Sequence, residues 1–153
     1  MLAVAGKLDT SLGGLPVDII SEPFSTRRSV YALVDRQNLP GVFRTFDFAN
    51  PDTSSQRRFS TTVPQQALFL LNGPFVVEQA QNLAQRPEVR DAGTCSRSIE
   101  ALYRVVFQRK PAAGELVLGE KFIANQNSHS AGLTPLEKYA QVLLLSNELV
   151  FID

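Results

Sequence analysis

The chain has 153 residues, of which 44% are hydrophobic, and its 15 basic and 15 acidic residues leave no net charge. This size and composition predict one globular domain, or one domain with an arm, and argue against disorder of the whole chain. The balanced charge argues against a nucleic-acid-binding domain, which needs a basic excess to contact phosphates, and it offers little repulsion against self-association.

Several classes of site have no support in the sequence. No apolar run approaches the roughly 20 residues of a membrane-spanning helix, so no membrane span is predicted. Cys95 is the single cysteine and cannot form an internal disulfide or a CxxC motif. His129, the only histidine, lies in a polar stretch without the partners that catalysis or metal binding requires. The sequence therefore predicts no cofactor, no metal site and no catalytic residue.

The first part of the chain, residues 1–28, is predicted to be an arm or connector. Residues 1–9 fit the end of a helix, and Gly13-Gly14-Leu15-Pro16 interrupts regular structure directly afterwards. Residues 17–27 contain Pro23 and show no sustained periodicity, which is typical of an irregular segment. We expect the remainder, residues 29–153, to form a single helical domain.

Residues 29–34 leave two structures open. Their β-branched and aromatic side chains favour a short strand, which would pair with residues 56–61 across a loop. A two-turn helix fits equally well, because an apolar run of this length carries no decisive period. Three phenylalanines between residues 43 and 48 need a core to pack against.

Residues 62–83 predict two short helices that meet at a corner. Thr62 and Gln65 have the spacing of a capping box, and Asn72-Gly73-Pro74 ends one helix and opens the next. The first helix is expected to be almost entirely buried, because its apolar residues surround it: Val63, Ala67, Leu68, Leu70 and Leu71. In the second, we expect an inward face with Gln79 and Gln81 pointing away from it: Val76, Ala80 and Leu83.

Residues 96–108 show the clearest helical period in the chain, with five apolar residues on one face: Ile99, Leu102, Tyr103, Val106 and Phe107. Arg109 and Lys110 complement the carboxyl end of that helix, and Pro111 opens the next, with Glu115 near its positive end. Thr134 to Glu137 forms a second capping box. The predicted fold class is therefore mainly α, with an irregular N-terminal arm, an optional two-stranded element and a bundle of four to five short helices.

The arginines give the chain its one candidate site. Arg27-Arg28 precedes the first of the two segments that would pair as strands, Arg57-Arg58 lies in the second, and Asp47 lies between the two pairs. If those segments pair, the guanidinium groups converge, either as an ion-pair network that braces a loop or as an anion site for carboxylate, sulfate or phosphate.

Four stretches resemble a known family: residues 2–14, 27–76, 102–111 and 136–153, with TTVPQQALFLLNGPFV at residues 61–76 the most specific. They are similar to the C-terminal domain of unknown function of large planctomycete multidomain proteins that also carry cytochrome-type domains. The resemblance implies that the chain is a C-terminal part of a longer protein, exported to the periplasm or cell surface. Its partners would be the N-terminal domains of the same polypeptide. The resemblance implies no catalytic residue.

Two hypotheses for function follow. The first is a non-catalytic structural or interaction module that closes a larger protein. The second is a glycan- or anion-binding module, or part of an enzyme acting on acidic or sulfated polysaccharide, that uses Arg27, Arg28, Arg57, Arg58 and Asp47.

Overall fold

A computed structural model describes residues 1–52, 54, 64–125 and 132–150 of the chain. Their helices are a 3-10 helix η1 (Ser29–Tyr31) and the α-helices α1 (Gly41–Thr45), α2 (Pro64–Asn72), α3 (Pro74–Ala84), α4 (Pro87–Arg90), α5 (Cys95–Phe107), α6 (Ala113–Ala124), α7 (Pro135–Leu144) and α8 (Asn147–Val150). The described residues contain isolated β-bridges and no strand. The prediction of a mainly helical fold of short helices is confirmed.

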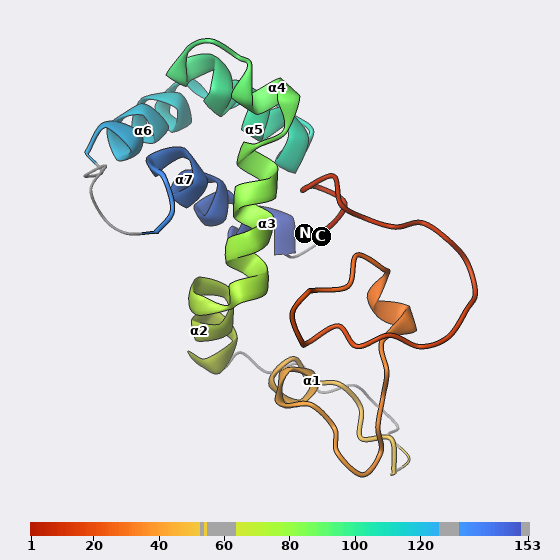
Figure 1. Cartoon of the computed structure of the whole chain (residues 1–153). Coiled ribbons are helices and arrows are strands. Elements are labelled where there is room, and N and C mark those ends of the chain that lie inside the picture. Colours follow the sequence, from red (N-terminus) through yellow and green to blue (C-terminus); the bar gives the residue numbers. More distant parts are fainter. Residues whose placement is uncertain (53, 55–63, 126–131, 151–153) are drawn as a thin grey trace. The chain divides into compact units, whose positions relative to one another are not determined.

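The chain divides into two compact units. One, the helical unit, consists of Met1–Lys7 with Leu71–Asp153, and the other, the loop unit, consists of Leu8–Leu70. In the helical unit, α7 packs against α3, and α6 packs against both α5 and α7 (Figure 1). Its core is one cluster of buried side chains: Ala80, Leu83, Val89, Ile99, Leu102, Tyr103, Val106, Tyr139, Ala140, Leu143 and Leu144.

The corner at Asn72-Gly73-Pro74 forms as predicted. Helix α2 ends at Asn72, Gly73 precedes α3 with an extended backbone, and Pro74 occupies the first turn of α3, where no N–H is needed. Val76, Ala80 and Leu83 are buried, which confirms the inward face of α3. The prediction for Gln79 was wrong, because only 1% of this residue is exposed. The four-residue helix α4 also packs against α3, so the buried face of α3 is wider than its apolar residues alone predict.

Helices α5 and α7 follow their sequence signals closely. Four of the five predicted apolar residues of α5 are buried, and Phe107 is partly buried beside Tyr103, with ring centroids 5.2 Å apart. At the start of α7 the capping box closes in both directions. The Glu137 backbone N–H donates to Thr134 Oγ1 at 3.3 Å, and the Thr134 N–H donates to Glu137 Oε2 at 2.7 Å. These bonds satisfy two of the donors that a helix start leaves open.

Helix α6 approaches its neighbours closely at Gly119. A β-carbon built at this position would lie 2.6 Å from the Tyr139 hydroxyl oxygen and 3.1 Å from Ile99 Cδ1. Only a residue without a side chain fits there, so glycine lets α6 approach both α7 and α5. The pKa of Tyr139 is raised, first by burial and then by a hydrogen bond with Tyr103.

The loop unit has little regular structure. Residues 29–31 form η1, and Ala32 then makes a parallel bridge with Val17, in which the Val17 N–H donates to the Tyr31 carbonyl and the Leu33 N–H to the Val17 carbonyl. Of the two structures left open for residues 29–34, neither a strand nor a two-turn helix forms, since residues 29–31 make a single 3-10 turn and Ala32 makes one isolated bridge. The proposed pairing partner, residues 56–61, lies outside the described residues, as do Thr62 and His129.

No described residue of the loop unit is buried. Four of its phenylalanines instead contact one another in pairs: Phe43 with Phe48 in a tilted pair at 5.0 Å, and Phe46 with Phe69 edge to face at 5.4 Å between ring centroids. The prediction that the helix before the corner is almost entirely buried was wrong. Helix α2 has no buried residue, and Leu68 and Leu71 are 56% and 54% exposed. An apolar helix becomes buried only where a partner face exists, and periodicity alone does not supply one.

Candidate functional site

In the loop unit, residues 11–17 lie against residues 27–34 and form a layer with them. Backbone bonds join Val17 to Tyr31 and Leu33, and the Gly13 N–H donates to the Tyr31 hydroxyl oxygen at 3.0 Å. Gly13 and Gly14 have φ values of +76° and +94°, a backbone region that favours glycine. The two glycines thus form a loop of defined backbone conformation, where the sequence predicted only an interruption of regular structure.

Arg27 holds this layer together. Its guanidinium donates to the carbonyls of Gly13 and Leu15, the latter at 3.2 Å, and lies 4.1 Å from the centroid of the Tyr31 ring. A β-carbon at Gly14 would come within 3.2 Å of Arg27 Nη1, so the second glycine makes room for the arginine. The Nε of Arg27 is buried and finds no partner among the described residues. Two of the five N–H donors of Arg27 are thus directed at carbonyls of the loop.

The remaining residues of the predicted anion site lie in different settings. Arg28 is exposed and directly precedes η1. Asp47 follows α1 with a φ of 54°, a conformation that aspartate tolerates better than most residues. Arg57 and Arg58 lie outside the described residues. The anion site formed by these four groups with Arg27 therefore stays a prediction.

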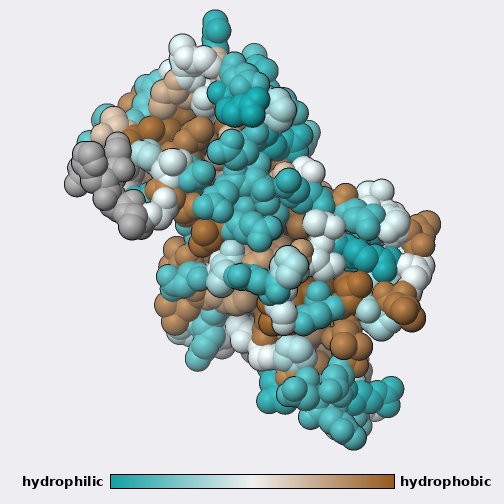
Figure 2. All heavy atoms as spheres, viewed as in Figure 1, coloured by the Kyte–Doolittle hydropathy of each residue, from teal (hydrophilic) through white to brown (hydrophobic). Residues whose placement is uncertain are grey.

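The layer exposes a set of large apolar side chains. Leu12 and Leu15 are 81% and 84% exposed, Val30 is 73% exposed, and Leu33 is 52% exposed. Figure 2 shows hydrophobic atoms at the surface in the part of the view where Figure 1 draws the red-to-orange trace of these residues. Single exposed leucines are common on protein surfaces, but several on one hydrogen-bonded layer mark a candidate contact surface. We call Leu12, Leu15, Val30 and Leu33 the apolar layer surface.

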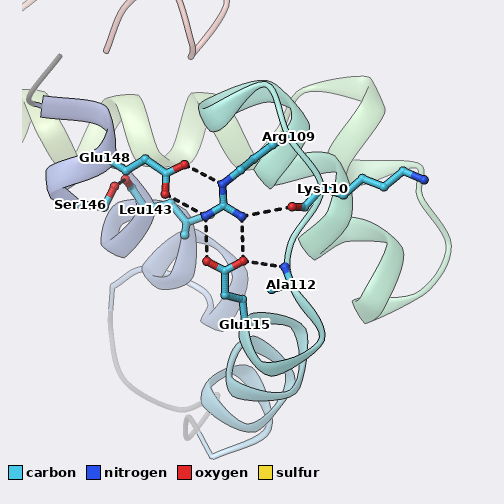
Figure 3. A network of polar contacts seen from close by, with 7 residues as sticks. All are labelled: Arg109, Lys110, Ala112, Glu115, Leu143, Ser146 and Glu148. Carbon is cyan, nitrogen blue, oxygen red and sulfur yellow. Dashed lines mark hydrogen bonds and ion pairs between the residues drawn. The ribbon is translucent and has the colours of Figure 1, made fainter. Parts of the chain in front are cut away.

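The densest polar cluster of the described residues centres on Arg109 in the helical unit. Figure 3 shows its guanidinium between Glu115 of the first turn of α6 and Glu148 of α8. The two bonds to Glu148 measure 2.7 and 2.8 Å, both bonds to Glu115 measure 2.8 Å, and a fifth reaches the Lys110 carbonyl at 3.1 Å. All five N–H donors of the arginine are thereby used.

This network shifts the ionisation of its members. The two-pronged hydrogen bond from Arg109, helped by the Ala112 backbone N–H at 2.6 Å, lowers the pKa of Glu115 from 4.5 to about 2. The pKa of Glu148 is lowered as well, mainly by its hydrogen bonds with Arg109. Both carboxylates therefore remain charged at neutral pH, and the cluster clamps three helices instead of supplying a proton donor or acceptor.

Only part of this network could be predicted from the sequence. Arg109 was predicted to complement the end of its helix and Glu115 to lie at the start of the next, and their spacing across Pro111 is a local signal that could have joined them. Glu148 lies 39 residues from Arg109 and carries no such signal. The contact of Glu148 with Arg109 depends on the path that the chain takes after α7.

Other candidate groups do not add a reactive centre. The pKa of Cys95 is raised, first by burial and then by the charge of Glu120, which disfavours the nucleophilic thiolate. In the described part of the chain, no group of three or more His, Cys, Asp or Glu side chains could hold a metal ion. No helix among these residues is long and apolar enough to cross a membrane.

Comparison with known proteins places the chain in a family. The model of the family described as PSD1, protein of unknown function (DUF1553), matches residues 1–123. The match covers both the layer of the loop unit and helices α3 to α5, and the chain belongs to this family. No curated protein and no solved structure matches the chain significantly.

Proposed function

We propose that the chain is a non-catalytic interaction module of a larger exported multidomain protein. In this proposal the apolar layer surface docks onto an N-terminal domain of the same polypeptide. The observation that carries the proposal is the exposure of apolar side chains in the loop unit. No described residue of the loop unit is buried, while Leu12 and Leu15 expose more than four-fifths of their surface, at 81% and 84%.

Burial of this surface would be favourable. Moving a leucine side chain from water into a packed contact contributes about 1.5–3 kcal/mol, so the three leucines and the valine of this surface can dominate a contact of modest area. The layer is also fixed before binding, because Arg27 bonds to the carbonyls of Gly13 and Leu15 and its guanidinium covers the Tyr31 ring. A fixed surface loses little conformational entropy when a partner covers it.

The polar groups of the helical unit support a structural role. The carboxylates of Glu115 and Glu148 are both satisfied by Arg109, and the Tyr139 hydroxyl faces the backbone of Gly119 in the interior. Groups arranged in this way stabilise a scaffold and leave no acid, base or nucleophile prepared for a reaction.

The test measures binding between this chain and the preceding segment of its own polypeptide, produced separately, by titration calorimetry. We expect a saturable complex that the double variant Leu12→Ser/Leu15→Ser weakens about tenfold or more, because both apolar anchors are lost. The matched control is Leu118→Ser on α6, which changes a leucine that is 68% exposed outside the layer. This control should bind like the unmodified chain.

Two results would contradict the proposal. One is the absence of any complex between the two parts. The other is equal binding by the double variant and the unmodified chain, which would place the contact elsewhere. Sedimentation of the chain alone should show a monomer, since a dimer formed through Leu12 and Leu15 would assign the surface to a second copy.

A further inference from the structure

The helical unit contains an open pocket that the interaction surface does not involve. Its volume is about 510 Å³, and it is lined by Ala3, Val4, Arg86, Glu88, Ala101, Arg104, Val105 and Gln108. This volume lies within the range of about 300–1,000 Å³ that is typical of small-molecule sites. Four of the lining residues are apolar and four are polar, so the pocket offers an apolar wall beside hydrogen-bonding groups.

One wall of the pocket is a single face of α5. Ala101, Arg104, Val105 and Gln108 follow one another at spacings of three, one and three residues, which places them on the same side of a helix. The opposite wall contains Arg86, whose Nη1 donates to the Val4 carbonyl at 2.9 Å and whose Nη2 pairs with Glu88 at 3.1 Å. These bonds fix the position of the Arg86 guanidinium and leave one N–H on each terminal nitrogen without a partner among the described residues.

Arg104 has unused hydrogen-bonding capacity. Its nearest charged partner is Glu100, at 3.8 Å, which is beyond hydrogen-bond distance. The Arg104 side chain donates no hydrogen bond to a described residue, and 59% of it is exposed. A guanidinium with a free planar edge matches a carboxylate through two parallel hydrogen bonds.

Gln108 completes the polar side of the pocket from an unusual backbone position. Its φ is 57°, and it occupies the left-handed position after α5, where glycine is the common residue. Its Nε2 donates to the Val105 carbonyl at 3.1 Å, which leaves its second N–H and its Oε1 available. A glycine would fit the backbone but would remove this amide from the pocket.

We propose that the pocket binds a small organic monocarboxylate. Its carboxylate would lie on Arg104 and Arg86, and its apolar part on Val4 and Val105. The lining groups carry two positive charges and one negative charge, and hydrogen bonds from Arg86 lower the pKa of Glu88, which keeps that carboxylate charged. Glu100, 3.8 Å from Arg104, partly offsets this excess of one positive charge, so the pocket suits a monoanion better than a phosphate dianion, and the apolar wall favours an organic ligand over an inorganic ion.

The test uses nitrogen-15-labelled chain and three probes at constant ionic strength: butyrate, its uncharged analogue butyramide, and inorganic phosphate. We expect butyrate to shift the amide resonances of residues 3–4, 86–88 and 101–108 in a saturable way, while butyramide does not. Arg104→Gln should weaken butyrate binding about tenfold, because it removes a charged two-pronged hydrogen bond. The matched control Arg97→Gln changes an exposed arginine of the same helix outside the pocket and should leave binding unchanged.

Three outcomes would overturn the proposal. They are the absence of saturable shifts, equal binding of butyramide and butyrate, and tighter binding of phosphate than of butyrate. If the amide resonances of residues outside the pocket are the same in Arg104→Gln as in the unmodified chain, the variant is folded. The result is independent of the proposed interaction, because neither arginine belongs to the apolar layer surface.

Discussion

The two units use the same kinds of apolar residue with opposite results. Leu102 in the helical unit is 0% exposed, whereas Leu15 in the loop unit is 84% exposed. In the helical unit apolar residues recur at helical spacing, so that whole faces meet. The layer of the loop unit lacks this recurring helical spacing, and hydrogen bonds hold it together instead. The difference teaches that apolar content alone does not make a core.

The largest expected effect comes from a pair of leucine substitutions, one in each unit. Leu102→Ala should lower the free energy of unfolding by about 2–5 kcal/mol, because it leaves a cavity in a packed cluster. Leu15→Ala should change it by less than about 0.5 kcal/mol, because the side chain is already in water. Urea denaturation followed by circular dichroism measures both.

The difference in packing between the two units would be contradicted if the two variants lost similar free energies of unfolding. A large loss for Leu15→Ala would mean that the loop unit has a core of its own in solution. A small loss for Leu102→Ala would mean that α5 is not packed as the structure shows.

A pair of glycine substitutions within α6 tests the close helix packing. Gly119→Ala should destabilise the chain by about 1–3 kcal/mol, because its β-carbon would meet the Tyr139 hydroxyl at 2.6 Å. Gly114→Ala meets nothing within 4 Å and should stabilise the helix by up to about 1 kcal/mol. Thermal unfolding should therefore separate the two variants in opposite directions, and equal shifts would contradict the close contact of α6 with α7.

Two threonines allow the units to be compared through side-chain hydrogen bonds. Thr134→Ala removes the capping bond at the start of α7 and should cost about 1 kcal/mol. Thr45→Ala removes an exposed bond to the Gly41 carbonyl at the end of α1 and should cost less than about 0.5 kcal/mol. Urea denaturation of both variants measures the difference, and a larger loss for Thr45→Ala would show that α1 contributes to global stability.

Local signals predicted much of the helical unit. The capping box at Thr134 and Glu137, the corner at Gly73 and the inward stripe of α5 each depend on residues within a few positions of one another, and each forms. The errors occur where the outcome depends on a partner. Gln79 was placed in water by its polarity but is buried at 1% exposure, in a helix that packs against both α4 and α7.

The candidate sites were predictable to a smaller extent. The arginines were identified from the sequence as candidates. The partners of Arg27, however, are backbone carbonyls of a glycine loop, and because every residue has a backbone carbonyl, the sequence does not show which ones it binds. The apolar layer surface was missed because the segment before Pro16 was interpreted as an interruption. The pocket was missed because Val4 and Arg86 lie 82 residues apart.

The smallest expected effect is a pH dependence that belongs to the helical unit alone. The folded pKa of Glu115 is about 2 against an ordinary value of 4.5, so the stability it contributes is present above about pH 4.5 and is lost as the pH falls toward 2. The lowered pKa of Glu148 acts in the same direction. Because both carboxylates are close to the surface, solvent screens much of the effect.

Arg109→Gln should remove this contribution, since it deletes the charge and the hydrogen bonds that lower the pKa of both carboxylates. The melting temperature of the variant should lie below that of the unmodified chain at neutral pH, and the gap should close as the pH falls below 4.5. Other carboxylates with lowered pKa values, such as Asp18 and Asp91, titrate in both proteins and cancel in the difference. Arg104→Gln, whose ion pair with Glu100 spans 3.8 Å, is the control and should show almost no gap. A gap for Arg109→Gln that stays constant down to acidic pH would mean that the arginine stabilises the three helices by packing on Tyr103 and Phe107 instead of by charge.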